Sequence, residues 1–185
     1  MSKNFIFLAQ GFEETEAITV VDLLRRASID ITTVSVTGEK IVTGSHQVPV
    51  VADTLFEETD FSSANFLILP GGMPGSVHLS QHKGLNELLI RHNATKKNVA
   101  AICAAPTVLG KLDLLQSKNA VCYPGFENEL YGATISNQTV VQDSNIVTAK
   151  GPGFAVDFGL YLVKLIKGES IAQEVAHNFL YQLTK

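Results

Sequence analysis

The sequence predicts an α/β fold with a mostly parallel central sheet. Short apolar segments that suit buried strands alternate along the chain with longer segments of helical periodicity. Strands that alternate with helices favour a parallel sheet covered on both faces, a flavodoxin-like three-layer sandwich. The chain has 185 residues, which suits one domain, and no linker, repeat or low-complexity tract divides it. We therefore assign residues 1–185 to a single domain.

Composition excludes several classes of function. The chain is 45% hydrophobic and 17% charged, and it lacks the run of about 20 apolar residues that a membrane helix needs. A net charge of −4 without a lysine and arginine cluster excludes a nucleic-acid footprint. The first ten residues do not resemble a secretory signal, so we expect a cytoplasmic protein with free thiols at Cys103 and Cys122. A small molecule or a protein side chain is the expected substrate.

The first half of the chain contains strands that pattern and composition identify. Residues 4–9 form an apolar strand, residues 30–37 alternate and are rich in β-branched residues, and residues 66–69 form another buried strand. Residues 41–43 and 48–52 predict a short hairpin around Gly44 and Ser45. Between the first two strands, residues 13–27 have helical periodicity and end in Arg25 and Arg26, which suit a helix C-terminus.

Three glutamates, Glu13, Glu14 and Glu16, fall in the first turn of that helix. Acidic side chains there complement the helix dipole, so a purely local role accounts for them. Glu16 shares a face with Val20, Leu23, Leu24 and Ala27, while Glu13 shares one with Ala17, Val20, Val21 and Leu24. Periodicity therefore leaves open which carboxyl group points inward.

The second half alternates in the same way. A helix carrying Leu85, Leu88, Leu89 and His92 ends near Asn93, with His92 expected at the surface or its boundary. Residues 120–123, 139–143 and 146–149 predict short strands, and a helix with Phe154 and Phe158 on its apolar face ends at Gly168. Ser170 and Gln173 predict a capping box for a last helix, whose inward face would include Leu183. We expect His177 on its polar face.

Residues 98–110 are the segment around which the chain is organised. A small apolar strand ends at Cys103, and a helix start follows with Pro106 in its first turn. A cysteine on such a sharp turn has the geometry of a nucleophile elbow, and free amides at the helix start would lower its pKa below about 8.5. A small cysteine packed in the core is the alternative, because free cysteine is among the most buried residue types.

Two glycine-rich loops follow predicted strands. Residues 70–75 read Pro-Gly-Gly-Met-Pro-Gly, and residues 150–153 read Lys-Gly-Pro-Gly. The first loop lies at the carboxyl end of a parallel strand, where open α/β sheets place their sites, and its glycines allow a close approach of backbone to ligand. Neither loop matches a phosphate-binding motif, so no nucleotide is implied.

Four motifs together resemble the ThiJ/PfpI superfamily. They are G-F-E-E-T-E-A at residues 11–17, L-P-G-G at 69–72, A-A-I-C-A-A-P at 100–106 and K-G-P-G at 150–153. The resemblance is greatest to the branch of the parkinsonism-associated protein deglycase and its bacterial chaperone-like relatives. It implies that Cys103 is the nucleophilic, oxidisable cysteine and that Glu16 contacts its sulfur. It also implies an oxyanion site at the amides of Gly72 and Ala104.

The same resemblance implies a pocket that includes Gly71, Tyr123 and Pro152, without a metal or another cofactor. It also implies a homodimer that pairs through the first helix. The expected function is a cysteine-dependent deglycase or glyoxalase that acts on methylglyoxal-type dicarbonyls or on their adducts with protein side chains. A redox-sensing or chaperone-like stress protein, using an oxidisable Cys103, is the alternative. A role in thiamine-thiazole synthesis has only the superfamily name to favour it.

Two positions depart from the pattern of the superfamily. The peptidase branch has a histidine directly after the cysteine, where this chain has Ala104, so a Cys-His dyad is not available there. The deglycase has a histidine near its cysteine, at a position that we align with Tyr123. Tyrosine can donate a hydrogen bond but is a poor base at pH 7, which leaves Glu16 as the main acid/base candidate. We expect Cys122 to be a packed neighbour.

Overall fold

The computed structural model describes residues 3–182, and its central sheet has 7 strands in the order β10-β11-β7-β6-β1-β2-β5. Adjacent strands pair in parallel, except for β10 and β11, which form an antiparallel pair at one edge. The strands of this sheet are β1 (Lys3–Leu8), β2 (Ile31–Ser35), β5 (Thr54–Leu55), β6 (Ala64–Leu69), β7 (Asn98–Ile102), β10 (Val140–Asp143) and β11 (Ile146–Ala149). The predicted α/β class and the mostly parallel sheet are confirmed.

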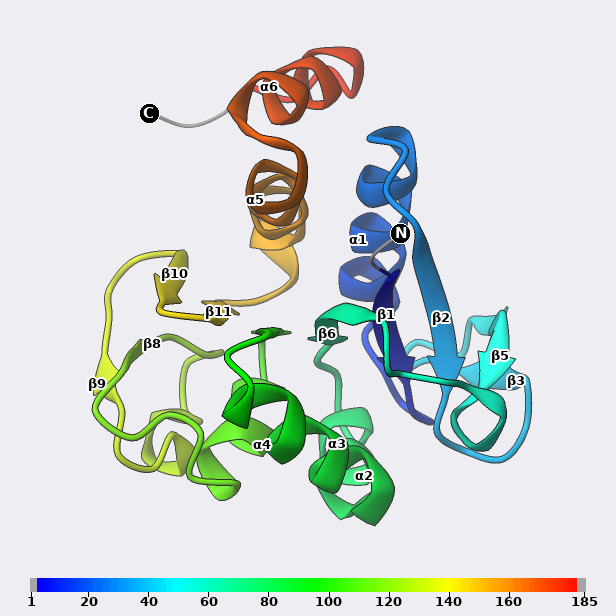
Figure 1. Ribbon diagram of the computed structural model, residues 1–185, viewed down its shortest axis with the longest axis vertical. Coiled ribbons are helices and arrows are strands. Elements are labelled where there is room, and N and C mark those ends of the chain that lie inside the picture. The colour runs from blue at the N-terminus through cyan, green and yellow to red at the C-terminus, as the bar shows by residue number, and fades with distance from the viewer. Residues whose placement is uncertain (1–2, 183–185) are drawn as a thin grey trace.

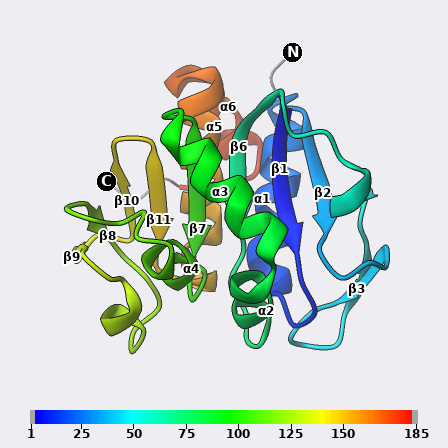
Figure 2. The same cartoon turned by 60° about the horizontal axis from the view of Figure 1, so that its bottom comes forward.

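Helices cover both faces of the sheet. One layer contains α1 (Glu14–Arg26), α5 (Ala155–Lys167) and α6 (Glu169–Asn178), and the other contains α2 (Gly75–Gln81), α3 (Lys83–Ala94) and α4 (Pro106–Lys111). Figure 1 shows the two groups of helices on opposite sides, and Figure 2 shows α3 in front of the strands with α1 and α5 behind them. The three layers match the flavodoxin-like sandwich that the alternation of elements predicts.

Residues of β1 show why these segments form buried strands. Ile6 and Leu8 face the core beneath α1 and α5, whereas Phe5 and Phe7 face the core beneath α3 and α4. All four are at most 2% exposed. Complete burial of a side chain of this size contributes about 1.5–3 kcal/mol, so continuous apolar runs are stable only between two helical layers.

Short elements differ most from the prediction. The hairpin of β3 (Ile41–Thr43) and β4 (Pro49–Val51) forms as expected, as a sheet of its own. By contrast, β8 (Asn119–Ala120) stops short of the predicted 120–123 strand and pairs with β9 (Thr134–Ile135) outside the main sheet. Two-residue strands such as β5 and β9 are set by a neighbour in space and leave no periodicity in the sequence. Within residues 3–182, single 3-10 turns lie at Phe56–Glu58, Glu127–Glu129 and Pro152–Phe154.

Two local predictions near the ends of helices are wrong. Helix α6 begins at Glu169, with Gly168 as its N-cap and no side-chain cap, so Ser170 already lies inside the helix and forms no capping box. His92 is 5% exposed, because its Nε2 lies 3.1 Å from the carbonyl oxygens of both Asn65 and Asn98 and is satisfied inside the fold. His177 is exposed, as expected.

The inward position expected for Leu183 lies outside the described residues. Among residues 3–182, no helix has the length and apolar character that crossing a membrane requires.

Candidate active site

The carboxyl ends of neighbouring parallel strands bring four distant segments together. The end of β6 leads to Gly71 and Gly72, the end of β7 leads to Cys103, and the end of β11 leads to Lys150. The end of β1 leads through a tight turn at Gly11 to the first turn of α1. This is the sheet edge at which the sequence places the site.

Cys103 forms the predicted sharp turn. It follows β7 directly and has a φ of 65°, a left-handed conformation that is costly for a residue with a side chain. Hydrogen bonds on both sides hold it there, because its N–H donates to the Ala149 carbonyl at 2.9 Å and its carbonyl accepts from the Tyr123 N–H at 2.8 Å. The side chain is half-buried and is a free thiol. Helix α4 begins only at Pro106, two residues beyond the turn at Ala104.

Gly71 keeps the space beside the sulfur open. A Cβ atom built on Gly71 would lie 2.6 Å from the Cys103 Cβ and 2.8 Å from the Glu16 Oε2. Any larger residue would therefore push Cys103 and Glu16 apart. The predicted presence of Gly71 in the site thus has a steric reason, which is the approach of two functional side chains across its backbone.

Glu16 is the carboxyl group that points inward, which the periodicity of α1 left undecided. It is 0% exposed, and its Oε2 accepts a 2.7 Å hydrogen bond from the Gly71 N–H. Its second oxygen, Oε1, has no hydrogen-bond partner among the described residues. Burial, together with the nearby charge of Glu13, outweighs the Gly71 and Cys103 interactions and raises the pKa of Glu16 to about 7. A buried carboxyl with one free oxygen therefore lies beside the thiol.

The expectation of a lowered pKa at Cys103 is wrong. Burial, followed by the negative charge of Glu16, raises the pKa of the Cys103 thiol to about 12, although the Gly72 and Ala104 amides act in the opposite direction. The six-residue α4 begins too far along the chain to outweigh these effects. Burial also raises the pKa of Cys122 to about 12, so the predicted gap between the two thiols is absent. Cys103 consequently needs a base to become a nucleophile, and Glu16 is adjacent.

The Gly72 and Ala104 amides face the sulfur, as the resemblance implied. Both donate hydrogen bonds toward Cys103 and favour its charged form. Gly72 has a φ of 93°, and a Cβ atom at this position would collide with the backbone of residues 11–13. The loop therefore needs glycine at this position to bring its N–H to the sulfur.

Tyr123 and Pro152 lie together beside the elbow. They line a cavity of about 360 Å³ whose wall also includes Pro124, Lys150, Gly151, Gly153 and Phe154. A Cβ atom on Gly151 would lie 3.1 Å from the Tyr123 ring, so the ring packs directly over that backbone. Cys122 points away from this region into the apolar core beneath α3 and α4, where it is 2% exposed.

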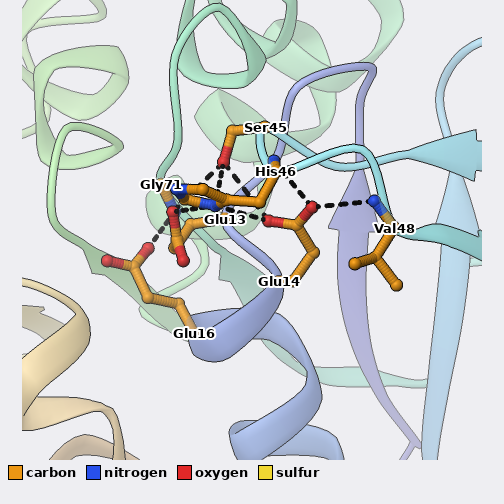
Figure 3. Close-up of polar contacts among 7 residues, drawn as sticks. All are labelled: Glu13, Glu14, Glu16, Ser45, His46, Val48 and Gly71. Atoms are coloured by element: carbon orange, nitrogen blue, oxygen red, sulfur yellow. Dashed lines mark hydrogen bonds and ion pairs between the residues drawn. The ribbon is translucent and has the colours of Figure 1, made fainter.

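A second polar cluster surrounds the first turn of α1 (Figure 3). Glu13, Glu14 and His46 each offer a potential metal-ligand atom within 4.8 Å of the others. Glu14 is already engaged, because its carboxylate accepts hydrogen bonds from the backbone N–H groups of His46 at 2.8 Å and Val48 at 3.3 Å. The cluster therefore fastens the β3–β4 hairpin to α1, and we name these three side chains the hairpin latch.

Electrostatics supports this structural role of the hairpin latch. Burial would raise the pKa of Glu14, but hydrogen bonds from its own amide and from His46 and Val48 outweigh it and lower the pKa to about 2. A hydrogen bond with Glu14 and the charge of Glu13 raise the pKa of His46. The sequence contains no signal for the latch, because His46 lies more than 30 positions from either glutamate and no motif spacing joins them.

The fold and site together define a class of protein: a three-layer α/β domain with a cysteine elbow and a buried glutamate at its sheet edge. The DJ-1/PfpI family model matches residues 2–165. Drosophila melanogaster protein dj-1beta is 35% identical over 183 residues, covering 97% of this chain and 98% of the relative. The Danio rerio Parkinson disease protein 7 homolog is 30% identical, with 94% of each chain covered.

A solved structure agrees with these relatives. Oxidized Toxoplasma gondii DJ-1 superposes with a TM-score of 0.94 at 34% sequence identity, covering 98% of this chain and 99% of the other. The chain belongs to the DJ-1/PfpI family, and the resemblance drawn from its four motifs is confirmed.

Proposed function

We propose that this protein is a cysteine-dependent, cofactor-independent glyoxalase or deglycase that acts on methylglyoxal-type dicarbonyls or on their adducts with protein side chains. One observation carries the proposal: a buried glutamate with a pKa of about 7 and an unpaired Oε1 lies beside the elbow cysteine. A group that titrates near the working pH is the most effective acid/base catalyst, because it both accepts and returns protons readily. The high pKa of the Cys103 thiol makes such a partner necessary.

The first step forms a carbon–sulfur bond. Glu16 takes the thiol proton while the Cys103 sulfur adds to the aldehyde carbon of methylglyoxal. Glu16 then passes that proton to the new alkoxide oxygen, which gives a hemithioacetal and leaves Glu16 free to act as a base again. The Gly72 and Ala104 amides, which face the sulfur, donate to the oxygen that becomes negative. Two preorganised amide donors in a buried site stabilise such an oxyanion by about 3–4 kcal/mol or more.

The second step moves a proton within the adduct. Glu16 carries it from the hemithioacetal carbon to the neighbouring carbonyl carbon, so the aldehyde carbon is oxidised to a thioester and the ketone is reduced to a secondary alcohol. Water then hydrolyses the lactoyl thioester and releases lactate, which returns the thiol. No external oxidant or reductant is consumed, so the sequence needs no cofactor.

A redox-sensing or chaperone-like role is the second candidate. The unpaired Glu16 Oε1 supports it, because a protonated carboxyl at this position can donate a hydrogen bond to an oxidised Cys103. The similarity to a DJ-1 structure described as oxidized also supports it. A peptidase role is disfavoured, because residue 104 is alanine and does not supply the histidine of a Cys-His dyad.

Lactate formation from methylglyoxal by the wild type, Cys103→Ala and Glu16→Gln tests the proposal. Loss of the nucleophile should abolish turnover, and loss of the acid/base group should lower it by about 10²–10⁴-fold. Glu16→Gln also removes the charge that opposes the thiolate, so iodoacetamide should label Cys103 in this variant at least as fast as in the wild type. A wild type without turnover, whose Cys103 peroxide still oxidises, would favour the sensor.

Surface and thiol chemistry support two further parts of the proposal. Ile18 on α1 and Val48 and Val51 on the hairpin are exposed apolar side chains, at 43%, 51% and 69%, and we assign them to a homodimer interface. Ile18 lies on the same side of α1 as the hairpin, because Glu14, four residues before it on the same face of the helix, binds the hairpin.

Both cysteines are free thiols, which supports the cytoplasm as the proposed compartment.

A further inference from the structure

The cavity beside the elbow is a separate feature that the proposed mechanism does not use. Two backbone hydrogen bonds of Cys103 connect it to the wall of this cavity. The Tyr123 N–H donates to the Cys103 carbonyl, and the Cys103 N–H donates to the carbonyl of Ala149, which directly precedes Lys150. Tyr123 and Lys150 both line the cavity. The cavity therefore adjoins the backbone of the elbow residue that carries the sulfur.

Lys150 is the only charged residue among those that line this cavity. The other members of the wall are Tyr123, Pro124, Gly151, Pro152, Gly153 and Phe154. Within residues 3–182, no carboxylate lies within 4.0 Å of the Lys150 Nζ as an ion-pair partner. An apolar, aromatic wall with one unpaired cation is suited to a short carbon chain that ends in an anion.

The charge on the other flank of Cys103 has the opposite sign. Glu13 is the N-cap residue of α1, and Glu14 and Glu16 lie in its first turn. The Glu13 N–H donates to the Gly71 carbonyl and the Glu16 carboxylate accepts from the Gly71 N–H, which places this turn on the side of Gly71. A substrate with an anionic end is repelled from that flank and attracted to the Lys150 flank. Opposite charges on the two flanks would orient such a substrate with its carbonyl end at Cys103 and its anionic end in the cavity.

We propose that this cavity is a carboxylate subsite, and that the preferred substrates are α-oxoaldehydes whose carbon chain ends in a carboxylate. The inference rests on the proposed function and names its substrate class. For 4,5-dioxopentanoate, the same addition, proton transfer and hydrolysis would consume one water and yield 2-hydroxyglutarate. The carboxylate takes no part in bond making and interacts only with Lys150 and the cavity wall.

The first test compares 4,5-dioxopentanoate with its uncharged methyl ester and with methylglyoxal. Lys150→Met should lower kcat/KM for the anionic substrate by about two- to fivefold, as expected for one solvent-accessible ion pair, while leaving the neutral substrates unchanged. Lys150→Arg should retain the preference. Lys97→Met is the matched control, because Lys97 directly precedes the opposite end of β7, about 20 Å along the strand from Cys103. An equal loss for all three substrates would overturn the inference.

A second test does not depend on turnover. Iodoacetate and iodoacetamide alkylate the same sulfur but differ in charge, so the ratio of their rates at Cys103 measures attraction of an anion. The ratio should fall in Lys150→Met, stay unchanged in Lys97→Met, and fall with added salt in the wild type. An unchanged ratio in Lys150→Met would refute the subsite. Absence of turnover with an altered ratio would instead refute the proposed function and leave the anion subsite standing.

Discussion

At the scale of single residues, Glu16 makes the stability of the fold depend on pH. Folding raises its pKa from 4.5 to about 7, so the folded protein binds this proton more tightly than the unfolded chain. The resulting stabilisation is fully present below pH 4.5 and is lost as the pH rises through about 7. At 1.36 kcal/mol for each pKa unit, the difference amounts to about 3 kcal/mol.

Glu16→Gln should remove this dependence. The amide is uncharged at every pH and its oxygen can still accept from the Gly71 N–H. Relative to the wild type, the variant should therefore gain about 3 kcal/mol in free energy of unfolding between pH 4.5 and pH 8. Urea unfolding at the two pH values measures this gain. Glu174→Gln, at an exposed position on α6, is the control, and a gain no larger than in the control would contradict a raised pKa at Glu16.

The sequence was sufficient to identify Cys103 as an elbow, and the motif resemblance pointed to Glu16 as its partner. Helical periodicity could not choose between Glu13 and Glu16, because the choice depends on the Gly71 amide, which lies 55 positions from Glu16 in the chain. The local sequence also could not predict the pKa of Cys103. Burial and the Glu16 charge are properties of the folded protein, and they outweigh the local helix start on which the prediction relied.

At the scale of elements, the hairpin latch holds the β3–β4 hairpin against α1. Glu14→Gln keeps the shape of the side chain but removes its charge, which weakens the hydrogen bonds from the His46 and Val48 amides. We expect these two amides to exchange hydrogen faster, corresponding to a loss of about 1 kcal/mol in local stability. Hydrogen exchange read by NMR tests this at pH 6. Equal exchange in Glu14→Gln and in the exposed control Glu39→Gln would show that the latch contributes nothing.

The stability that the hairpin latch contributes also depends on pH. The contribution of His46 is fully present below its ordinary pKa of 6.5 and is lost as the pH rises through its raised pKa in the folded protein. The contribution of Glu14 is present above pH 4.5 and is lost as the pH falls toward about 2. Protection of the hairpin amides should therefore be greatest in mildly acidic solution.

Long elements were predictable and short ones were not. The strands β1, β6, β7 and β11 are apolar runs buried on both faces, and that pattern is visible in the sequence. Helix α2 begins at Gly75 inside a segment rich in glycine and proline, which composition assigns to a loop. The predicted capping box does not form because Gly168 already ends α5 and starts α6, so the helix boundary lies two residues earlier than the serine suggested.

At the scale of the whole molecule, the proposed homodimer makes a prediction about mass. The chain weighs 20.0 kDa, so light scattering should give about 40 kDa at micromolar concentration for a two-chain assembly. Val51→Glu places a charge at a side chain that is 69% exposed, within the proposed interface, and should shift the mass toward the monomer. Ile135→Glu is the matched control, because Ile135 is exposed on the separate β8–β9 sheet. A monomeric wild type would rule out the interface.

The left-handed turn at Cys103 is held from outside its own segment, by the carbonyl of Ala149 and the amide of Tyr123. During synthesis, the ribosome delivers Cys103 well before either of these partners. A nascent chain that ends before β11 contains the cysteine and Glu16 but lacks the strand that fixes the turn. We therefore expect the proposed reactivity of this thiol toward dicarbonyls to arise late in translation, after most of the chain has emerged, and a truncated chain should lack it.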